Sequence, residues 1–266
     1  MPTLLNPDYR LTIQFSLGGL SFVLFDTAAR SVADLELHQS DSLNNADELF
    51  RVLEKDLRPR DLGNGRCQSV TCIVDGRTST LVPEDLYRPA DCDKLLSFGF
   101  TLPSGYVTAA DPVENHQAYN LYAYPEALRD RILAKWPEAQ ICHSTTVFLK
   151  SLPQSETPVV HVNVRNRDFD MAIMQDRLLF FNNFKFQTKV DFSYYLLYAM
   201  QQHELSGLET PVWFTGLIQP GSEIIDLCRR YLKDIRFVTR PRDFKVKEML
   251  GEVPFQYYYN HYQILK

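Results

Sequence analysis

Hydrophobic and polar residues alternate along residues 11–26, and a similar alternation returns 149 positions later at residues 160–175. Alternation with a period of two on both sides of a short turn is typical of a β-hairpin. Gly18-Gly19 stands at the centre of the first copy, where a tight turn needs positive φ, and Arg167-Asp168 stands at the centre of the second. The pattern therefore predicts two hairpins, each at the start of one half of a duplicated chain.

Each predicted hairpin is followed by strands and helices in a similar order. In the first half, apolar spacing predicts strands at 31–38, 68–74, 78–82, 117–124 and 139–143, and helices at 44–57, 125–136 and 144–152. Prolines break the weak apolar pieces of residues 84–115, so an irregular insertion is expected there. In the second half, strands are predicted at 177–186, 211–215 and 235–239, and helices at 188–207 and 221–232. Residues 152–158 are the predicted boundary, which gives halves of 1–152 and 153–266.

Composition narrows the class of protein without pointing to an activity. With 266 residues, 45% of them hydrophobic, the chain can bury one large core or two smaller ones. A net charge of −5 gives no general attraction for nucleic acid or an anionic membrane. The sequence starts without a signal-peptide pattern, and no stretch approaches the ~20 apolar residues that span a bilayer. We therefore expect a cytoplasmic protein without a nucleic-acid partner or direct membrane insertion.

The cysteines and histidines give no sign of a metal or redox site. The five cysteines are odd in number and include no C-x-x-C pair, which favours buried thiols over disulfides or a zinc site. The six histidines show no metal-binding spacing. Cys142 and His143 are adjacent, so on a strand their side chains would face opposite sides, which argues against a catalytic dyad.

Three antiparallel strands running into strand, helix, strand and helix form the plan of the ribonuclease H core. Two such units in tandem resemble the actin-like ATPase superfamily. Residues 79–86, 120–125, 181–184 and 191–195 also resemble a Bacteroidetes family of uncharacterised proteins. The resemblance implies a fold similar to those of the actin-like cell-division protein and the actin-like protein of the type IV pilus platform, without implying an activity. The expected fold class is α/β, with two mixed-sheet subdomains flanked by helices.

The sequence departs from that superfamily where its chemistry resides. Active members carry an acid and then a glycine on the first strand and turn of each half, because the carboxylates hold Mg²⁺ through water and glycine lets the backbone approach phosphate. Here the acid positions fall near Gln14 and Asn163, and the glycine positions fall near Ser16 and Arg165. Losing both acids removes the metal and its stabilisation of phosphoryl transfer. We therefore expect no ATPase or kinase activity, no catalytic residue and no metal.

A degenerate ligand site could remain at the same positions. The backbone at Gly18-Gly19 could cradle an anion, although a tight hairpin needs such glycines for its own geometry. The arginines of the second turn could bind phosphate, although exposed hairpin arginines are common. The adenosine-contacting glycine pair of the superfamily is reduced to one glycine, which could also serve helix entry. The full candidate set is Ser16, Gly18, Gly19, Asn163, Arg165, Asn166, Asp170, Thr215 and Gly216.

Two further segments have no assigned role. Arg-Pro-Arg-Asp occurs at 58–61 and again at 240–243, as turn chemistry or as two parts of a basic patch. The aromatic tail, residues 255–262, is expected to pack on its parent half, with partner docking as the alternative.

Three functional hypotheses remain open. The first is a non-catalytic actin-like interaction or scaffold protein with a protein partner, a degenerate nucleotide cleft and no cofactor. The second is a protein that binds ATP or another nucleotide, or hydrolyses it slowly, by recruiting Asp26, Asp168 or Asp170. The third, nuclease chemistry on a ribonuclease H core, needs a cluster of acids around two metals that the hairpin strands do not supply.

Overall fold

The computed structural model describes residues 9–16, 18–40, 42–57, 67–242, 244–246, 250 and 254–266. The chain divides into two compact units. Unit 1 comprises Met1–Lys150, Arg242–Glu252 and Asn260–Lys266, and unit 2 comprises Ser151–Pro241 and Val253–Tyr259. The expected division after residue 152 left the whole C-terminal tail in the second half. In the structure the tail contributes to both units.

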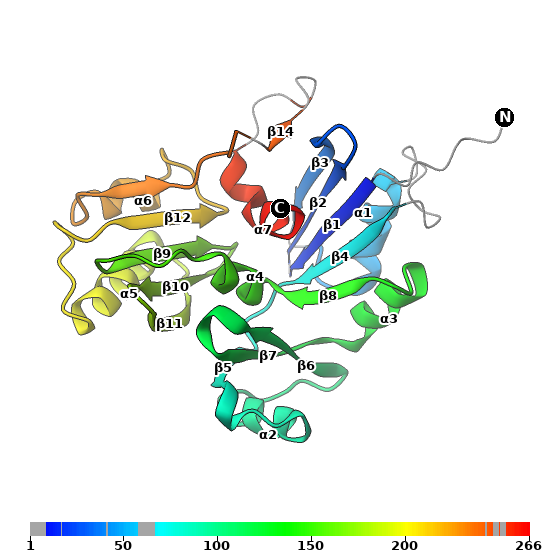
Figure 1. Cartoon of the computed structure of the whole chain (residues 1–266), viewed down its shortest axis with the longest axis horizontal. Helices are drawn as coiled ribbons and strands as arrows, with labels where there is room; N and C mark the ends of the chain where they lie inside the picture. Colours follow the sequence, from blue (N-terminus) through cyan, green and yellow to red (C-terminus); the bar gives the residue numbers. More distant parts are fainter. Residues whose placement is uncertain are drawn as a thin grey trace. The chain divides into compact units, whose positions relative to one another are not determined.

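Unit 1 is built on a six-stranded sheet in the order β14-β3-β2-β1-β4-β8 (Figure 1). Its strands are β1 (Tyr9–Ser16), β2 (Gly19–Asp26), β3 (Ser31–Gln39), β4 (Ser69–Val74), β8 (Gln140–His143) and β14 (Lys245–Val246), and its helices include α1 (Ala46–Leu57), α3 (Glu126–Lys135) and α4 (Ser144–Ser151). The buried side chains of α1, Leu49, Phe50 and Leu53, share one core with Ile13 and Phe15. Helical spacing on α1 and alternation on β1 thus bring one apolar face of each together.

A three-stranded sheet in the order β5-β7-β6 occupies the region expected to be an irregular insertion. Its strands are β5 (Ser79–Pro83), β6 (Tyr106–Val113) and β7 (Ala118–Pro125), with α2 (Cys92–Ser97) and the short 3₁₀ helices η3 (Glu84–Leu86), η4 (Pro89–Asp91) and η5 (Glu114–His116). The prediction missed β6 because Pro112 argued against a strand. β6 is an edge strand, where proline is tolerated since only one side donates to the ladder.

The C-terminal helix α7 (Tyr259–Leu265) was not predicted either. Its residues from Asn260 onward belong to unit 1, where His261 is fully buried against β1 and β2. Its ring nitrogens lie 2.8 Å from the hydroxyls of Thr12 and Ser21. Thr12 alternates along β1 with the residues that face α1, so α7 covers the opposite face of the sheet. Arg10 donates to the backbone oxygens of Ile264 and Leu265 at 2.8 and 2.9 Å, which satisfies carbonyls at the end of the helix.

Unit 2 repeats the strand order of unit 1, as β11-β10-β9-β12-β13. The elements are β9 (Val159–Val164), β10 (Asp168–Met174), β11 (Leu178–Lys185), α5 (Lys189–Gln202), β12 (Val212–Gly216), α6 (Glu223–Cys228), β13 (Ile235–Phe237) and the 3₁₀ helix η7 (Phe255–Tyr258). Ile13 pairs with Phe22 in the first hairpin, and Val162 pairs with Met171 in the second. The two registers coincide at the predicted offset, which confirms the two hairpins. Helix α6 ends at Cys228, one turn earlier than expected.

The buried contact of His261 predicts a pH-dependent stability. Burial lowers the pKa of His261 to about 3, well below its ordinary value. Below pH ~6.5 the His261 imidazole is protonated in the unfolded chain and stays neutral in the folded chain. The free energy of unfolding therefore falls by about 1.4 kcal/mol per pH unit because of this residue alone. Between pH 7 and pH 5, the loss due to His261 is expected to reach ~2 kcal/mol.

The measurement is urea unfolding of the wild type and of His261→Asn at both pH values. Other buried groups contribute equally to the two proteins, so the difference between their pH slopes isolates His261. The variant should be less stable at pH 7 and lose less on acidification. Equal slopes in the two proteins would contradict a neutral, buried His261.

Candidate functional site

The first hairpin turn is filled by contacts within unit 1. Gly18 has φ of 80°, its N–H donates to the Leu43 carbonyl at 2.8 Å, and its carbonyl accepts from the Ser40 N–H at 3.0 Å. The Ser16 hydroxyl donates to the Gly19 carbonyl at 3.2 Å. An anion at this turn would compete with the Leu43 carbonyl for the Gly18 N–H. The geometry of the hairpin turn and its hydrogen bonds therefore explain the glycine at position 18 without a bound anion.

Gln14, which replaces the first acid, is also engaged within unit 1. Its Oε1 accepts a hydrogen bond from Asn260 Nδ2 of α7 at 3.2 Å. An amide oxygen is a neutral acceptor, so this position supplies a contact to the C-terminal helix and no negative charge for a metal.

The second hairpin is closed by a buried ion pair. Arg165 donates from Nη1 and Nη2 to the two oxygens of Asp170 at 2.5 and 2.9 Å, and from Nε to Asp168 at 2.5 Å. Asn183 on β11 adds a hydrogen bond from its Nδ2 to Asp170 at 3.0 Å. Asp170 is fully buried and Arg165 is only 8% exposed. The arginine thus stands in the glycine position of the superfamily pattern, and its planar group binds the carboxylate in a fork.

The ends of β9 and β12 bring three candidate residues together. These strands are parallel, with Asn163 beside Thr215 and Val164 beside Gly216. Gly216 has φ of +83°, and a Cβ there would lie 2.1 Å from the Val164 carbonyl, so no other residue fits. Among the described residues, Nδ2 of Asn163 is buried without a hydrogen-bond partner. It is the one candidate atom here whose bonding capacity is unused by the described chain.

The C-terminal tail covers the end of β12 in unit 2. Thr215 Oγ1 donates to the Gln256 carbonyl of η7 at 3.2 Å, and Gln256 Nε2 donates to the Ile218 carbonyl at 3.0 Å. The adenosine-contacting position expected at Thr215-Gly216 is therefore in contact with the chain's own backbone. The tail was expected to pack on its parent half, and η7 does so.

The remaining candidates lie apart from these contacts. Asn166 and Arg167 are exposed at the tip of the second turn. Asp26 pairs with Tyr9 at the end of the first hairpin far from its turn, and its Oδ1 accepts the Ala29 N–H at 2.8 Å. A strand of this length separates its two ends by about 23 Å, so Asp26 is not a substitute carboxylate at the turn.

A buried polar cluster in unit 1 was missed by the sequence analysis. Asp111 accepts hydrogen bonds from the His143 N–H at 2.8 Å, the Thr146 hydroxyl at 2.8 Å and the Tyr122 hydroxyl at 3.0 Å. Burial raises the pKa of Asp111, although these donors oppose the shift. The carboxylate joins β6 to β7 and to the start of α4. The sequence analysis missed this cluster because it did not predict β6, the strand that carries Asp111.

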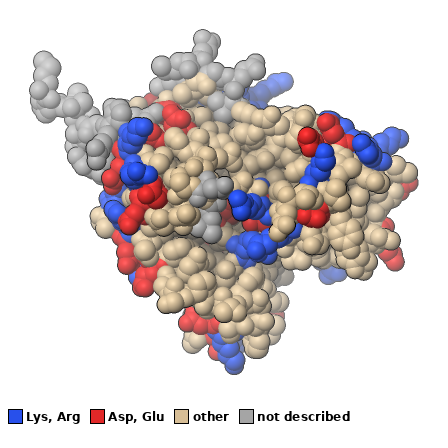
Figure 2. All heavy atoms as spheres, turned by 180° about the vertical axis from the view of Figure 1, so that it is seen from behind, with Lys and Arg blue, Asp and Glu red and all other residues tan. Residues whose placement is uncertain are grey.

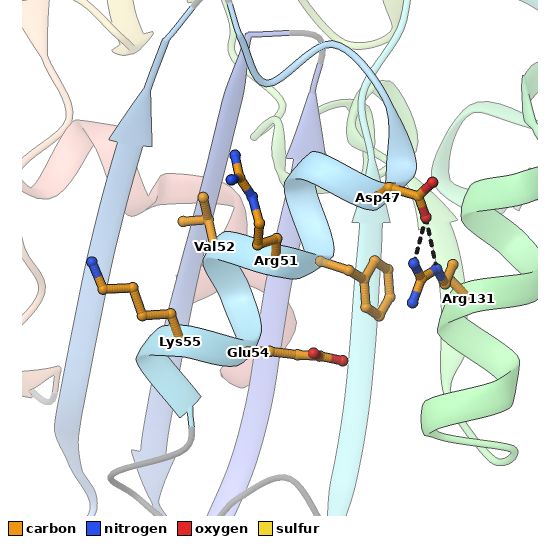
Figure 3. Close-up of a pocket in the computed structure, with 7 residues that line it drawn as sticks. Asp47, Arg51, Val52, Glu54, Lys55 and Arg131 are labelled. Carbon is orange, nitrogen blue, oxygen red and sulfur yellow. Dashed lines mark hydrogen bonds and ion pairs between the residues drawn. The ribbon is translucent and has the colours of Figure 1, made fainter.

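A surface depression of about 560 Å³ lies on α1 in unit 1 (Figure 3). Its lining residues are Asp47, Phe50, Arg51, Val52, Glu54, Lys55 and Arg131. Asp47 and Arg131 form an ion pair, and the guanidinium of Arg131 also lies over the Phe50 ring. The depression thus contains charges of both signs, and none of its lining residues belongs to the candidate set predicted from the sequence.

In the part of the chain that the structure describes, no group of three histidine, cysteine or acidic side chains could hold a metal ion. Burial raises the pKa of the Cys142 thiol to about 12, so it carries almost no thiolate near neutral pH. The first Arg-Pro-Arg-Asp segment and Asp243 of the second lie outside the described residues. Across those that are described, no helix is long and apolar enough to cross a membrane.

Comparison with known proteins places the chain in a family. Residues 3–235 match the family described as "Protein of unknown function (DUF3822)". The chain belongs to this family. A search of the curated proteins found no match.

Solved structures show the fold. A Bacteroides thetaiotaomicron protein with an actin-like ATPase fold and unknown function is 16% identical, with a TM-score of 0.74, covering 87% of this chain and 91% of that one. The type IV pilus biogenesis complex PilM–PilN contains a chain that is 9% identical, with a TM-score of 0.62, covering 97% of this chain and 98% of that one. This DUF3822 protein therefore has the actin-like ATPase fold that its strand order predicted.

The ion pair of unit 2 predicts an asymmetric mutational response. Arg165→Met leaves the buried Asp170 carboxylate without its cation, which costs about 3–5 kcal/mol. Asp170→Asn leaves Arg165 bonded to Asp168, so only the charged hydrogen bonds to Asp170 are lost, at about 1.5–3 kcal/mol. Arg165→Met combined with Asp170→Leu removes both charges and is expected to be more stable than either single variant. Denaturant unfolding followed by circular dichroism measures all three.

The exposed pair Arg229–Asp226 on α6 provides the matched control. Its side chains are 49% and 64% exposed, and Asp226→Asn is expected to change stability by less than about 1 kcal/mol. If Asp170→Asn proved as mild as Asp226→Asn, the ion pair would not be the buried constraint described above.

Proposed function

We propose that this protein is a non-catalytic, actin-like interaction or scaffold protein whose nucleotide positions have been taken over by its own chain. The observation that carries the proposal is the Arg165–Asp170 pair. It supplies a cation where the superfamily pattern has a glycine, and it neutralises the best remaining carboxylate. A magnesium ion at Asp170 would have to displace Arg165, and that buried guanidinium would keep only Asp168 of its two carboxylate partners.

The proposal includes a protein partner and a cytoplasmic location. Support for a partner comes from the PilM–PilN complex, an assembly of two proteins in which one chain has a fold similar to that of this protein. On the face drawn in Figure 2, basic and acidic side chains are interspersed, which gives no block of positive charge for nucleic acid. The resemblance to the Bacteroides protein supports an origin in the Bacteroidetes.

Nucleotide binding without catalysis is the second candidate function. It is favoured by one atom, the buried Nδ2 of Asn163, which has no partner among the described residues and lies beside Thr215 and Gly216. A ligand acceptor could satisfy this amide, because a buried donor without a partner costs about 1–3 kcal/mol. A ligand at Thr215 would first have to displace Gln256 of η7.

Thermal unfolding of the full chain with and without nucleotide tests the two candidates. ATP, ADP and GTP are each added in millimolar excess, with and without Mg²⁺. A ligand held only by the folded chain at about 100 times its dissociation constant would add roughly 2.7 kcal/mol and raise the midpoint by several degrees. We expect no shift and no phosphate release, because both acid positions are amides and Asp170 is paired.

Controls with Mg²⁺ alone and adenosine alone separate ionic-strength effects from binding. A magnesium-dependent shift with ATP would overturn the non-catalytic proposal. A shift with nucleotide that does not need Mg²⁺, and that disappears in Asn163→Leu, would establish the second candidate instead.

A further inference from the structure

The outer edge of unit 2 differs from the corresponding edge of unit 1. The third strand of the three-stranded antiparallel segment is β3 in unit 1 and β11 in unit 2. In unit 1 the strand β14 pairs with the first residues of β3, in parallel, and Phe244 stacks on Phe25 beside it. β11 is the outermost strand of its sheet, and no described strand pairs with its other side (Figure 1). Among the described residues, an added strand, β14, thus covers the edge of β3 and no strand covers the equivalent edge of β11.

The backbone of β11 is oriented to accept an added strand. The Phe186 N–H donates to the Arg167 carbonyl on the hairpin side. In an antiparallel pair the bonded positions alternate, so the N–H groups of Phe180, Asn182 and Phe184 point to β10. Those of Phe181, Asn183 and Lys185 point to the outer edge, and the Asn183 N–H donates to Oδ1 of its neighbour Asn182 at 2.9 Å, which leaves Phe181 and Lys185 as the donors to an added strand. Residues 180–184 contain no proline and no charge that would block edge pairing; Lys185 and the register shift against β10, between Leu178 and Phe180, lie at the two ends of this stretch.

Helix α5 presents an uncharged aromatic surface beside that edge. Tyr194 and Tyr198 are 58% and 47% exposed and stack on each other at 5.7 Å, and Tyr195 stacks on Phe184 of β11 at 5.5 Å. Residues 192–202 of the helix carry no charge. Exposed tyrosines without neighbouring charges are typical of the centre of a protein interface.

The charges near the two ends of β11 indicate that the partner carries acidic residues. Residues 177–190 contain Arg177, Lys185 and Lys189 and no acid, in a protein whose net charge is −5. Lys189 is paired with Glu223, while Arg177 and Lys185 lie exposed near the two ends of β11. A second copy of the chain would bring Lys185 close to Arg177 of the other copy in an antiparallel β11 pair, so like charges disfavour self-pairing.

We propose that β11 and the tyrosine face of α5 form a docking surface for an extended segment of another protein, with alternating apolar residues and acidic residues at its ends. The segment adds a strand to β11 through Phe181 and Lys185, and its side chains on the α5 side contact Tyr195 and Tyr198. This mode combines main-chain hydrogen bonds with side-chain selection. The inference deepens the proposed interaction role by naming the surface and the kind of partner.

The test uses the full-length protein and a defined probe, a fluorescein-labelled nonapeptide of alternating valine and threonine with glutamate at both ends. Anisotropy titration should show binding at least about tenfold tighter than that of the same core with lysine at both ends, as expected for charge contacts worth ~1.4 kcal/mol. Lys185→Glu leaves one positive end, Arg177, and one negative end, so it should abolish the preference between the two peptides. Lys233→Glu, an equal charge change at an exposed lysine away from β11, should leave it unchanged.

A second pair of variants isolates the backbone contact. Phe181→Pro and Phe181→Ala both remove the ring, but only proline removes the outward N–H. We expect the proline variant to bind the acidic peptide about tenfold more weakly than the alanine variant. Amide hydrogen exchange should show peptide-dependent protection at Phe181 and Lys185.

Several results would overturn the inference: no binding at millimolar peptide, equal binding by the two Phe181 variants, or a wild-type dimer in sedimentation that Lys185→Glu alters. These outcomes are independent of the nucleotide test. A magnesium–ATP shift would refute the proposed non-catalytic role and leave β11 untouched, whereas loss of peptide selectivity would refute the surface and leave that role standing.

Discussion

The charge balance inside the second hairpin is the constraint on which unit 2 depends. Arg165 and Asp170 are both buried, and each is tolerated in that environment because the other is present. Phosphate would need the guanidinium released from its carboxylate, and a metal would need the carboxylate released from its guanidinium. Either exchange breaks the two-point contact between Arg165 and Asp170 in a region shielded from water. The hairpin thus keeps the strand pairing of the first hairpin and carries a buried ion pair beside its turn.

Unit 1 reaches a comparable result with different residues. Its first hairpin turn is satisfied by the Leu43 carbonyl, and Gln14 is bonded to Asn260 of the C-terminal helix. The same helix buries His261 between two hydroxyls, so a neutral imidazole is part of the sheet face. In both units, groups that could serve a ligand instead hold the chain's own segments together, and the C-terminal tail supplies one such segment to each.

Much of this fold could be predicted from the sequence, because periodicity in a hairpin specifies its register. The offset of 149 residues between the pairs Ile13–Phe22 and Val162–Met171 follows from the matching alternation of the two segments. Strand β6 was missed because Pro112 is permitted only by its edge position, which is a property of the sheet order. Helix α7 was missed because its aromatic and polar residues show no helix pattern and gain their stability from burial against β1 and β2.

The sequence predicted which residues of the second hairpin belong to the candidate site, but it did not predict which of them bind each other. Sequence reasoning found Asp170 and Arg165 separately, the first as a substitute metal ligand and the second as a phosphate ligand. The alternation pattern places both residues on the same hairpin. It does not show that Arg165 and Asp170 bind each other, because this depends on how deeply the two side chains are buried, which the sequence pattern does not reveal. In the structure the two side chains satisfy each other. The edge of β11, which no strand among the described residues pairs, is then where the proposed partner would bind in this unit, because backbone groups at a sheet edge are the polar groups that remain for another strand.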